Sequence, residues 1–229
     1  MVEPLSRRRL LTLLAALAPG LRADEAGGSF QAKGLWRTTP LDVFGEIGYF
    51  IDEPCLGARP GDVELAEWAL QAWQRTVDGL LCFTPAPAAS ALVRVYWGQT
   101  GDRIGKMQAI EVGDRRGAEV YVDTHADRFD APMAGHSDAD PLFRDAVLYR
   151  TLLHEIGHGL GLVHTTGIED AMYFGGDYVG FYLRYRNSVG SREEMRFQPG
   201  ISATDRDRMA KLYPADTLVP PRAPKIPEA

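Results

Sequence analysis

The sequence predicts an α+β fold in which a mixed β-sheet carries helices on one face. Apolar residues form 45% of the 229-residue chain and charged residues 24%, the balance of an ordinary soluble globular protein. A strand-like segment comes first, a segment of helical periodicity follows it, and several strand-like runs come next. This order of elements is typical of a mixed sheet with a helix packed against it.

The first strand and the first helix are predicted within residues 44–79. The segment FGEIGYFIDEP, residues 44–54, is rich in β-forming residues and predicts a strand. Asp62 follows a Pro-Gly pair and is expected to be the N-cap of a helix that stops at the Asp-Gly pair of residues 78–79. Apolar residues recur on one face of this helix, which is expected to pack in the core: Val63, Ala66, Leu70, Trp73 and Val77.

Four strand-like runs follow this helix. The first two begin at Leu80 and Ala91, and the second of them alternates apolar and polar residues. Residues 117–124, GAEVYVDT, have the clearest strand pattern of the set. Residues 105–113, GKMQAIEVG, have a weaker pattern and are expected to form an edge strand.

A second long helix is predicted from Pro141 to Gly159. Asp140 is expected to be its N-cap, and a proline at the first helical position is favourable. Residues 124–140 are expected to form a polar loop before it, and residues 202–213 a short helix near the end of the domain. The segment between the helices predicted at 141–159 and 202–213 gives no clear prediction of structure. Its aromatic residues at 178–185 suit either a cleft or core packing.

The two ends of the chain are expected to lie outside the folded domain. In residues 6–23, three arginines precede an apolar stretch and the last residue is small, which is the layout of a secretory leader. The SRRRLL segment within them resembles a twin-arginine export signal, and a frayed amphipathic terminus is the alternative interpretation. We therefore expect export, with the protein secreted or periplasmic, and this organisation: signal peptide 1–23, lead-in 24–40, folded domain 41–214 and disordered proline-rich tail 215–229.

Charge and hydropathy exclude several classes of partner. Removing residues 1–23, which carry four arginines and one glutamate, changes the formal charge from −6 to −9. So acidic a chain has no electrostatic basis for binding nucleic acid or an anionic membrane. Apart from the leader, no segment approaches a membrane span. We expect a monomer whose partner is a protein or peptide.

Cys55 and Cys82 are the two cysteines of the chain. An even number of cysteines in an exported protein favours one disulfide, which would join the segment before the first helix to the segment after it. Two separate buried thiols are the alternative, because spacing alone does not establish the geometry that a disulfide requires.

The segment HEIGHGLGLVH, residues 154–164, holds three of the five histidines. His154 and His158 are four residues apart on the predicted helix, so their imidazoles lie on the same face and can share one zinc ion. Glu155 is next to the first of them, beside the metal rather than necessarily on it. Its carboxylate is expected to take a proton from the zinc-bound water and to deliver it to the leaving amine.

A third ligand requires the helix to end. On a continuous helix His164 would lie nearly two turns beyond His158, too far to share the metal. Gly159 or Gly161 can adopt the positive φ that ends a helix and reverses the chain, which would return His164 to the site. The alternative is that the histidines pack with ordinary hydrogen bonds. Five residue types at fixed offsets, however, coincide by chance on the order of once in 10⁵ chains of this length.

These residues resemble the zinc signature of the metzincin metallopeptidases, His-Glu-x-x-His-x-x-Gly-x-x-His. Met172 lies in EDAMYF, which resembles the methionine turn beneath the zinc of that clan, and Tyr173 directly after it is similar to matrixins. Asp205 and the Leu212-Tyr213 pair resemble the final matrixin helix, whose aspartate braces the methionine turn. The resemblance covers roughly residues 40–214.

The resemblance implies a metzincin-like fold with a twisted five-stranded mixed sheet, two long helices and a short C-terminal helix. It also implies that a substrate peptide lies along the edge strand near residues 106–112 by β-addition, with its scissile carbonyl over the zinc. The long matrixin loop that binds a second zinc and calcium is replaced by GQTGDRIG, residues 98–105, so neither ion is expected. Phe174-Gly175-Gly176 replaces the Pro-x-Tyr segment that walls the matrixin specificity pocket.

The leading hypothesis is therefore a secreted zinc metalloendopeptidase with one catalytic zinc ion. Its metal ligands would be His154, His158 and His164, and its catalytic residue Glu155. One alternative is a zinc-dependent binding module that does not cut, against which the intact glutamate argues. A second alternative is a metal hydrolase of a non-protein amide in the cell wall, which only substrate profiling would distinguish from a peptidase.

Overall fold

A computed structural model describes residues 40–41, 46–54, 57–77, 80–98 and 100–215. Internal contacts divide the chain into residues 1–34 and 35–229, and every described residue belongs to the second unit. The predicted leader 1–23 lies outside the described residues, as do all but the last residue of the lead-in 24–40 and all but the first residue of the tail 215–229. Cys55 is also outside them, whereas Cys82 has a free, exposed thiol.

Five strands form one mixed sheet in the order β2-β1-β3-β5-β4. Four strands run parallel, and β4 pairs antiparallel with β5 at one edge. The α+β class and the predicted edge strand are therefore confirmed. The strand bounds are β1 Glu46–Ile51, β2 Cys82–Pro85, β3 Val93–Trp97, β4 Gly105–Val112 and β5 Arg115–Val122.

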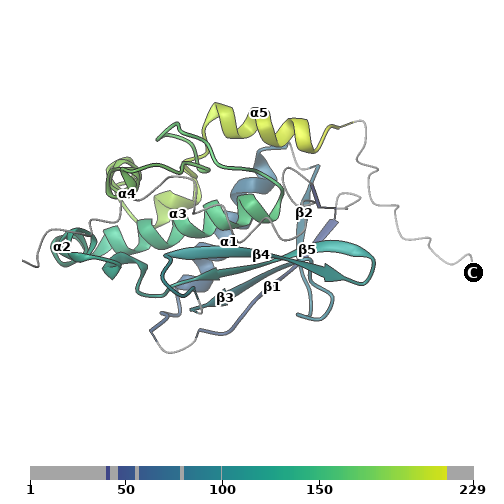
Figure 1. The fold of residues 1–229 in the computed structure, drawn as a ribbon, viewed down its shortest axis with the longest axis horizontal. Coiled ribbons are helices and arrows are strands. Elements are labelled where there is room, and N and C mark those ends of the chain that lie inside the picture. Colours follow the sequence, from purple (N-terminus) through teal and green to yellow (C-terminus); the bar gives the residue numbers. More distant parts are fainter. Residues whose placement is uncertain (1–39, 42–45, 55–56, 78–79, 99, 216–229) are drawn as a thin grey trace, which may run out of the picture. The chain divides into compact units, whose positions relative to one another are not determined.

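Two long helices, α1 (Asp62–Arg75) and α3 (Pro141–Gly159), cover the same face of the sheet (Figure 1). The predicted apolar stripe of α1 packs in the core, where Trp73 is fully buried and its indole nitrogen donates to the Leu153 carbonyl at 2.9 Å. Asp140 caps α3 as predicted, because its carboxylate accepts from the amide of Leu142. The α3 helix thus packs against both the sheet and α1.

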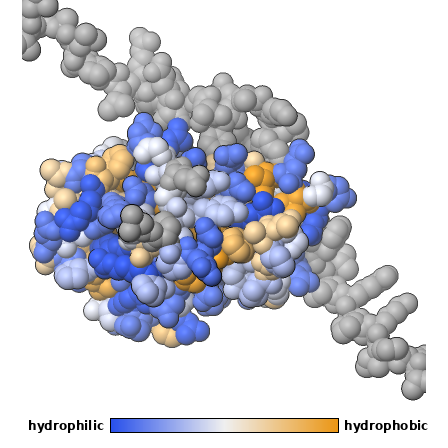
Figure 2. Space-filling model, turned by 90° about the horizontal axis from the view of Figure 1, so that it is seen from below, coloured by the Kyte–Doolittle hydropathy of each residue, from blue (hydrophilic) through white to orange (hydrophobic). Residues whose placement is uncertain are grey.

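The opposite face of the sheet carries polar and aromatic side chains. Phe50, Tyr96 and Tyr121 form a row of neighbouring rings across three strands, and the ammonium of Lys106 lies over the last of them. Figure 2, which views the molecule from below Figure 1, shows hydrophilic residues interspersed with the apolar ones on this side. None of the described helices is long and apolar enough to cross a membrane.

The prediction that Asp62 caps α1 is wrong. Gly61 is the N-cap, and Asp62 is the first helical residue, with a buried side chain. Its two carboxylate oxygens accept from the guanidinium of Arg144 on α3 at 2.6 and 2.8 Å. A tertiary ion pair has therefore replaced the local cap, which spacing along the sequence does not reveal.

Residues 124–140 form more than the predicted loop. They contain the short 3-10 helix η2 (Ala126–Arg128) and the helix α2 (Ala131–Ala139). Asp130 caps α2 by accepting from the amide of Met133, and Pro132 occupies its first turn. Only Met133 and Ser137 of this helix are buried, so it lacks the apolar periodicity that predicts a helix.

The segment after the histidines contains the helix α4 (Tyr178–Arg186) and the short helix η3 (Glu193–Arg196). Of its aromatic residues, Phe181, Tyr182 and Tyr185 are buried, so these three pack in the interior. The short helix predicted near the end is α5 (Ala203–Leu212), which begins with a capping box between Ser202 and Asp205.

We expect Asp62→Ala to lower the free energy of unfolding by about 3–5 kcal/mol, because the buried Arg144 would lose both of its short hydrogen bonds to a carboxylate and keep only the longer carboxylate contact, with Asp145. Urea unfolding of the purified protein measures this loss. The control is Glu64→Ala, which removes an exposed pair with Arg192 and should cost less than about 1 kcal/mol. Equal losses in the two variants would show that the buried pair has no special role.

Candidate metal centre

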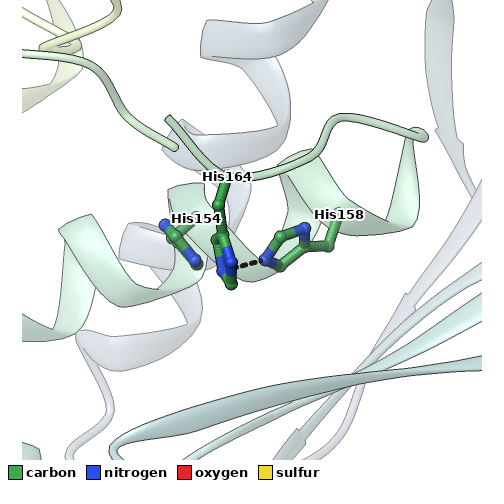
Figure 3. A group of neighbouring side chains, drawn as sticks. All are labelled: His154, His158 and His164. Carbon is green, nitrogen blue, oxygen red and sulfur yellow. Dashed lines mark hydrogen bonds between the residues drawn. The ribbon is translucent and has the colours of Figure 1, made fainter. Parts of the chain in front are cut away.

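The structure brings the three predicted histidines together. His154 and His158 lie one turn apart on α3 and are half-buried, and their ring centroids are 4.7 Å apart. His164 follows the helix and is exposed, with its Nε2 atom 3.0 Å from Nε2 of His158. One ligand atom from each residue lies within 4.8 Å of the others. Figure 3 shows the three rings converging on one point, so the group could hold a metal ion.

The chain reverses at Gly161. Its φ of +104° is in the left-handed region, and two hydrogen bonds close the helix end: Gly161 N to His158 O at 3.0 Å and Leu162 N to Gly157 O at 2.9 Å. This pair of bonds is a Schellman motif. Gly159 remains helical instead, where a Cβ would lie 3.0 Å from the Cβ of Ala118 on β5. The first glycine therefore serves packing, and the second returns His164 to the site.

Backbone carbonyls orient two of the imidazoles. Nδ1 of His154 lies 2.9 Å from the carbonyl oxygen of Ala171, and Nδ1 of His158 lies 2.9 Å from that of Leu162. Because a carbonyl oxygen only accepts, the hydrogen-bond network assigns the proton to Nδ1 in both rings. Their Nε2 lone pairs are thereby left for a metal. A carbonyl that accepts from the other ring nitrogen is the usual support of a histidine ligand.

The site keeps its histidines neutral. Burial, followed by the charges of the other two histidines, holds the pKa of His154 well below its usual value. Burial and His164 lower the pKa of His158 to about 4, and burial lowers that of His164 as well. Neutral imidazole is the form that coordinates metals, so at pH 7 the group needs no deprotonation to bind one.

Glu155 is buried and faces the edge strand. A Cβ on Gly105, at the start of β4, would lie 3.0 Å from the Cγ atom of Glu155, so the glycine permits this close approach. Burial raises the pKa of the Glu155 carboxyl to about 8, although the charge of Arg103 and a hydrogen bond from the Met107 amide both lower it. A carboxyl with such a pKa can accept and return a proton near neutrality.

Met172 lies beneath the histidines. Its side chain is fully buried against α3, where a Cβ on Gly157 would overlap its sulfur atom. The residue after His164 is tied to this turn, since the Thr165 amide donates to the Met172 carbonyl and the Phe174 amide to the Thr165 carbonyl, each at 2.9 Å. Met172 thus packs against α3 and is bonded through its carbonyl to the residue that follows His164.

Two buried side chains hold the residues before Met172. Asp205 on α5 accepts from the amide of Ala171 at 2.6 Å, and Arg150 on α3 donates to the carbonyl of Asp170 at 3.1 Å. Since the Ala171 carbonyl in turn orients His154, both side chains support the first histidine indirectly.

Sequence reasoning identified Asp205 but missed Arg150 and the contact between Phe174 and His164. Arg150 was recognisable only as a charge within the apolar part of α3, four residues before His154. The ring of Phe174 stacks on that of His164, and nothing in the sequence indicates this contact. No protein-family model and no curated protein matches the chain.

Proposed function

We propose that this chain is a zinc-dependent endopeptidase of metzincin-like, matrixin-like type. His154, His158 and His164 would hold one zinc ion, and Glu155 would be the catalytic general base. The observation that carries this proposal is the convergence of three neutral imidazoles beside a buried carboxyl. The buried Met172 below α3 and the hydrogen bond from Ala171 to Asp205 support the family resemblance.

The donor set suits zinc. Nitrogen ligands on a tetrahedral zinc at about 2.0–2.1 Å lie roughly 3.3 Å from each other, close to the 3.0 Å between Nε2 of His158 and Nε2 of His164. Three protein ligands leave one position open, as in catalytic rather than structural zinc sites. When bound, the ion would polarise the scissile carbonyl and acidify the attacking water.

Glu155 would carry the proton transfers. Its carboxylate would accept a proton from the attacking water and then deliver it to the nitrogen of the leaving amine. A raised pKa matches both steps, because the group must be a base in the first and an acid in the second. Burial against Gly105 restricts its side chain, so the carboxyl would stay beside the cleaved bond.

The edge strand β4 offers backbone groups to an extended peptide. Because the Ile104 carbonyl accepts from the Asp123 amide at 3.0 Å, alternate residues from 104 onward pair with β5. The amides and carbonyls of Gly105, Met107, Ala109 and Glu111 therefore point away from β5. A substrate strand pairing there would pass Glu155, which faces the first two of these residues.

We further propose that the protein is exported and acts as a monomer.

The test begins with the purified protein after dialysis. We expect metal analysis to give about one zinc ion per chain, and casein to be cleaved. A zinc chelator should abolish cleavage, and added zinc should restore it, because the open coordination position is needed for the chemistry. Cleavage that survives the chelator, or a chain that retains no zinc, would contradict the proposal. Zinc without casein cleavage would favour the binding module or the cell-wall hydrolase.

A further inference from the structure

The three histidines differ in what holds their rings. His154 and His158 lie on α3, and each has a backbone carbonyl on Nδ1. His164 lies beyond the helix end and is exposed, and none of the described residues bonds to its ring through a backbone carbonyl. An exposed side chain on a connecting segment would lose rotamer freedom on binding a metal. A contact that limits its orientation before a metal binds would reduce this loss.

The phenyl ring of Phe174 makes that contact. It lies nearly parallel to the imidazole of His164, with an interplanar angle of 11° and 4.4 Å between ring centroids. Aromatic pairs at this separation attract each other beyond the area that they bury. Phe174 is 52% exposed, so ordinary core packing does not explain its position.

The backbone around Phe174 aims its side chain at His164. Thr165 and Tyr173 form a parallel bridge, and the Phe174 amide donates to the Thr165 carbonyl, so the two segments run side by side. Successive residues of an extended segment point to opposite sides. Tyr173 accordingly turns inward onto Phe181, while Phe174 turns outward onto the histidine. Gly175 permits this arrangement, because a Cβ there would overlap the Tyr173 ring.

We propose that Phe174 is a positioning residue that holds the His164 imidazole in its metal-binding orientation by ring stacking. This inference rests on the proposed zinc site. In it, His164 is held by the side chain of Phe174, whereas His154 and His158 are held by backbone carbonyls. The FGG segment that follows Met172 and Tyr173 would thus serve the metal.

Three variants test the proposal. Phe174→Leu removes the ring but stays apolar, Phe174→Tyr retains the ring, and Phe197→Leu is the matched control at a phenylalanine that is 76% exposed. We expect the first to weaken zinc affinity about two- to tenfold, the usual size of an aromatic pair. The other two should bind zinc as the wild type does. Competition with a chromophoric chelator measures the affinity without any substrate.

A second measurement needs no metal. In the NMR spectrum of the metal-free chain, the ring current of Phe174 should shift the imidazole protons of His164, and the shift should be lost in Phe174→Leu and kept in Phe174→Tyr. Unchanged zinc affinity in Phe174→Leu, or an equal loss in Phe174→Tyr, would overturn the proposal. So would a Phe174→Leu variant that changes casein cleavage alone, because the ring would then contact substrate only. If the chain binds zinc with this dependence but cuts nothing, the positioning role holds and the proposed peptidase activity fails.

Discussion

The Glu155→Gln variant is expected to bind one zinc ion and to cleave casein about 10²- to 10⁴-fold more slowly than the wild type, the usual contribution of a general acid–base group. Glutamine has nearly the same shape, so it should fit against Gly105 as the glutamate does. It cannot accept the proton of the attacking water, however. Zinc content should persist, because the three proposed ligands are histidines. Initial cleavage rates and metal analysis of the same preparation measure both outcomes.

The matched control for this variant is Glu64→Gln, at a glutamate on α1 whose side chain is 57% exposed. It should cut at the wild-type rate. Undiminished cleavage by Glu155→Gln would refute the assignment of the base. Loss of zinc in Glu155→Gln would instead make the carboxylate a ligand, which conflicts with its position toward β4.

The His164→Ala variant is expected to lose zinc affinity by more than about 100-fold, since removing even an outer partner of a metal ligand typically costs 10- to 100-fold. The remaining pair, His154 and His158, would leave two protein ligands where catalytic zinc sites have three. The free energy of unfolding of the metal-free variant should lie within about 0.5 kcal/mol of that of the metal-free wild type, because the side chain is exposed. Chelator competition and urea unfolding give the two quantities.

His125→Ala is the control for this experiment, because His125 is exposed and precedes η2, apart from the three clustered histidines. It should retain zinc at wild-type affinity. If His164→Ala kept its zinc through dialysis, the site would have only two histidine ligands, and the reversal at Gly161 would have another purpose. A large loss of unfolding free energy would show that His164 is a structural residue.

Local patterns predicted the elements that carry the site. The i, i+4 spacing placed His154 and His158 on one face of a helix, and the Asp140-Pro141 pair marked where that helix begins. The two glycines predicted that the helix ends before His164, but they did not show which of them would reverse the chain. These features depend on neighbours in the sequence, which is why the sequence sufficed for them.

What the sequence did not reveal depends on distant partners. Asp62 has the composition of an N-cap but pairs with Arg144, which is 82 residues away. Arg150 reaches a carbonyl 20 residues later in the chain, and Phe174 faces His164 only because two extended segments run side by side. The helix α2 was missed for a different reason, because its few buried residues leave no period to detect. Tertiary contacts decide such roles, and local sequence patterns do not predict these contacts.

The hydrogen bond from Ala171 to Asp205 also sets an order of assembly. The Ala171 carbonyl orients His154, but the Ala171 amide is held by a carboxylate 34 residues later, on the last helix of the domain. During synthesis from the N-terminus, the histidine segment emerges well before that helix exists. The last support of the first histidine therefore arrives only when α5 docks. A chain that stops before α5 would carry all three histidines but would lack the hydrogen bond that fixes the Ala171 segment beside His154.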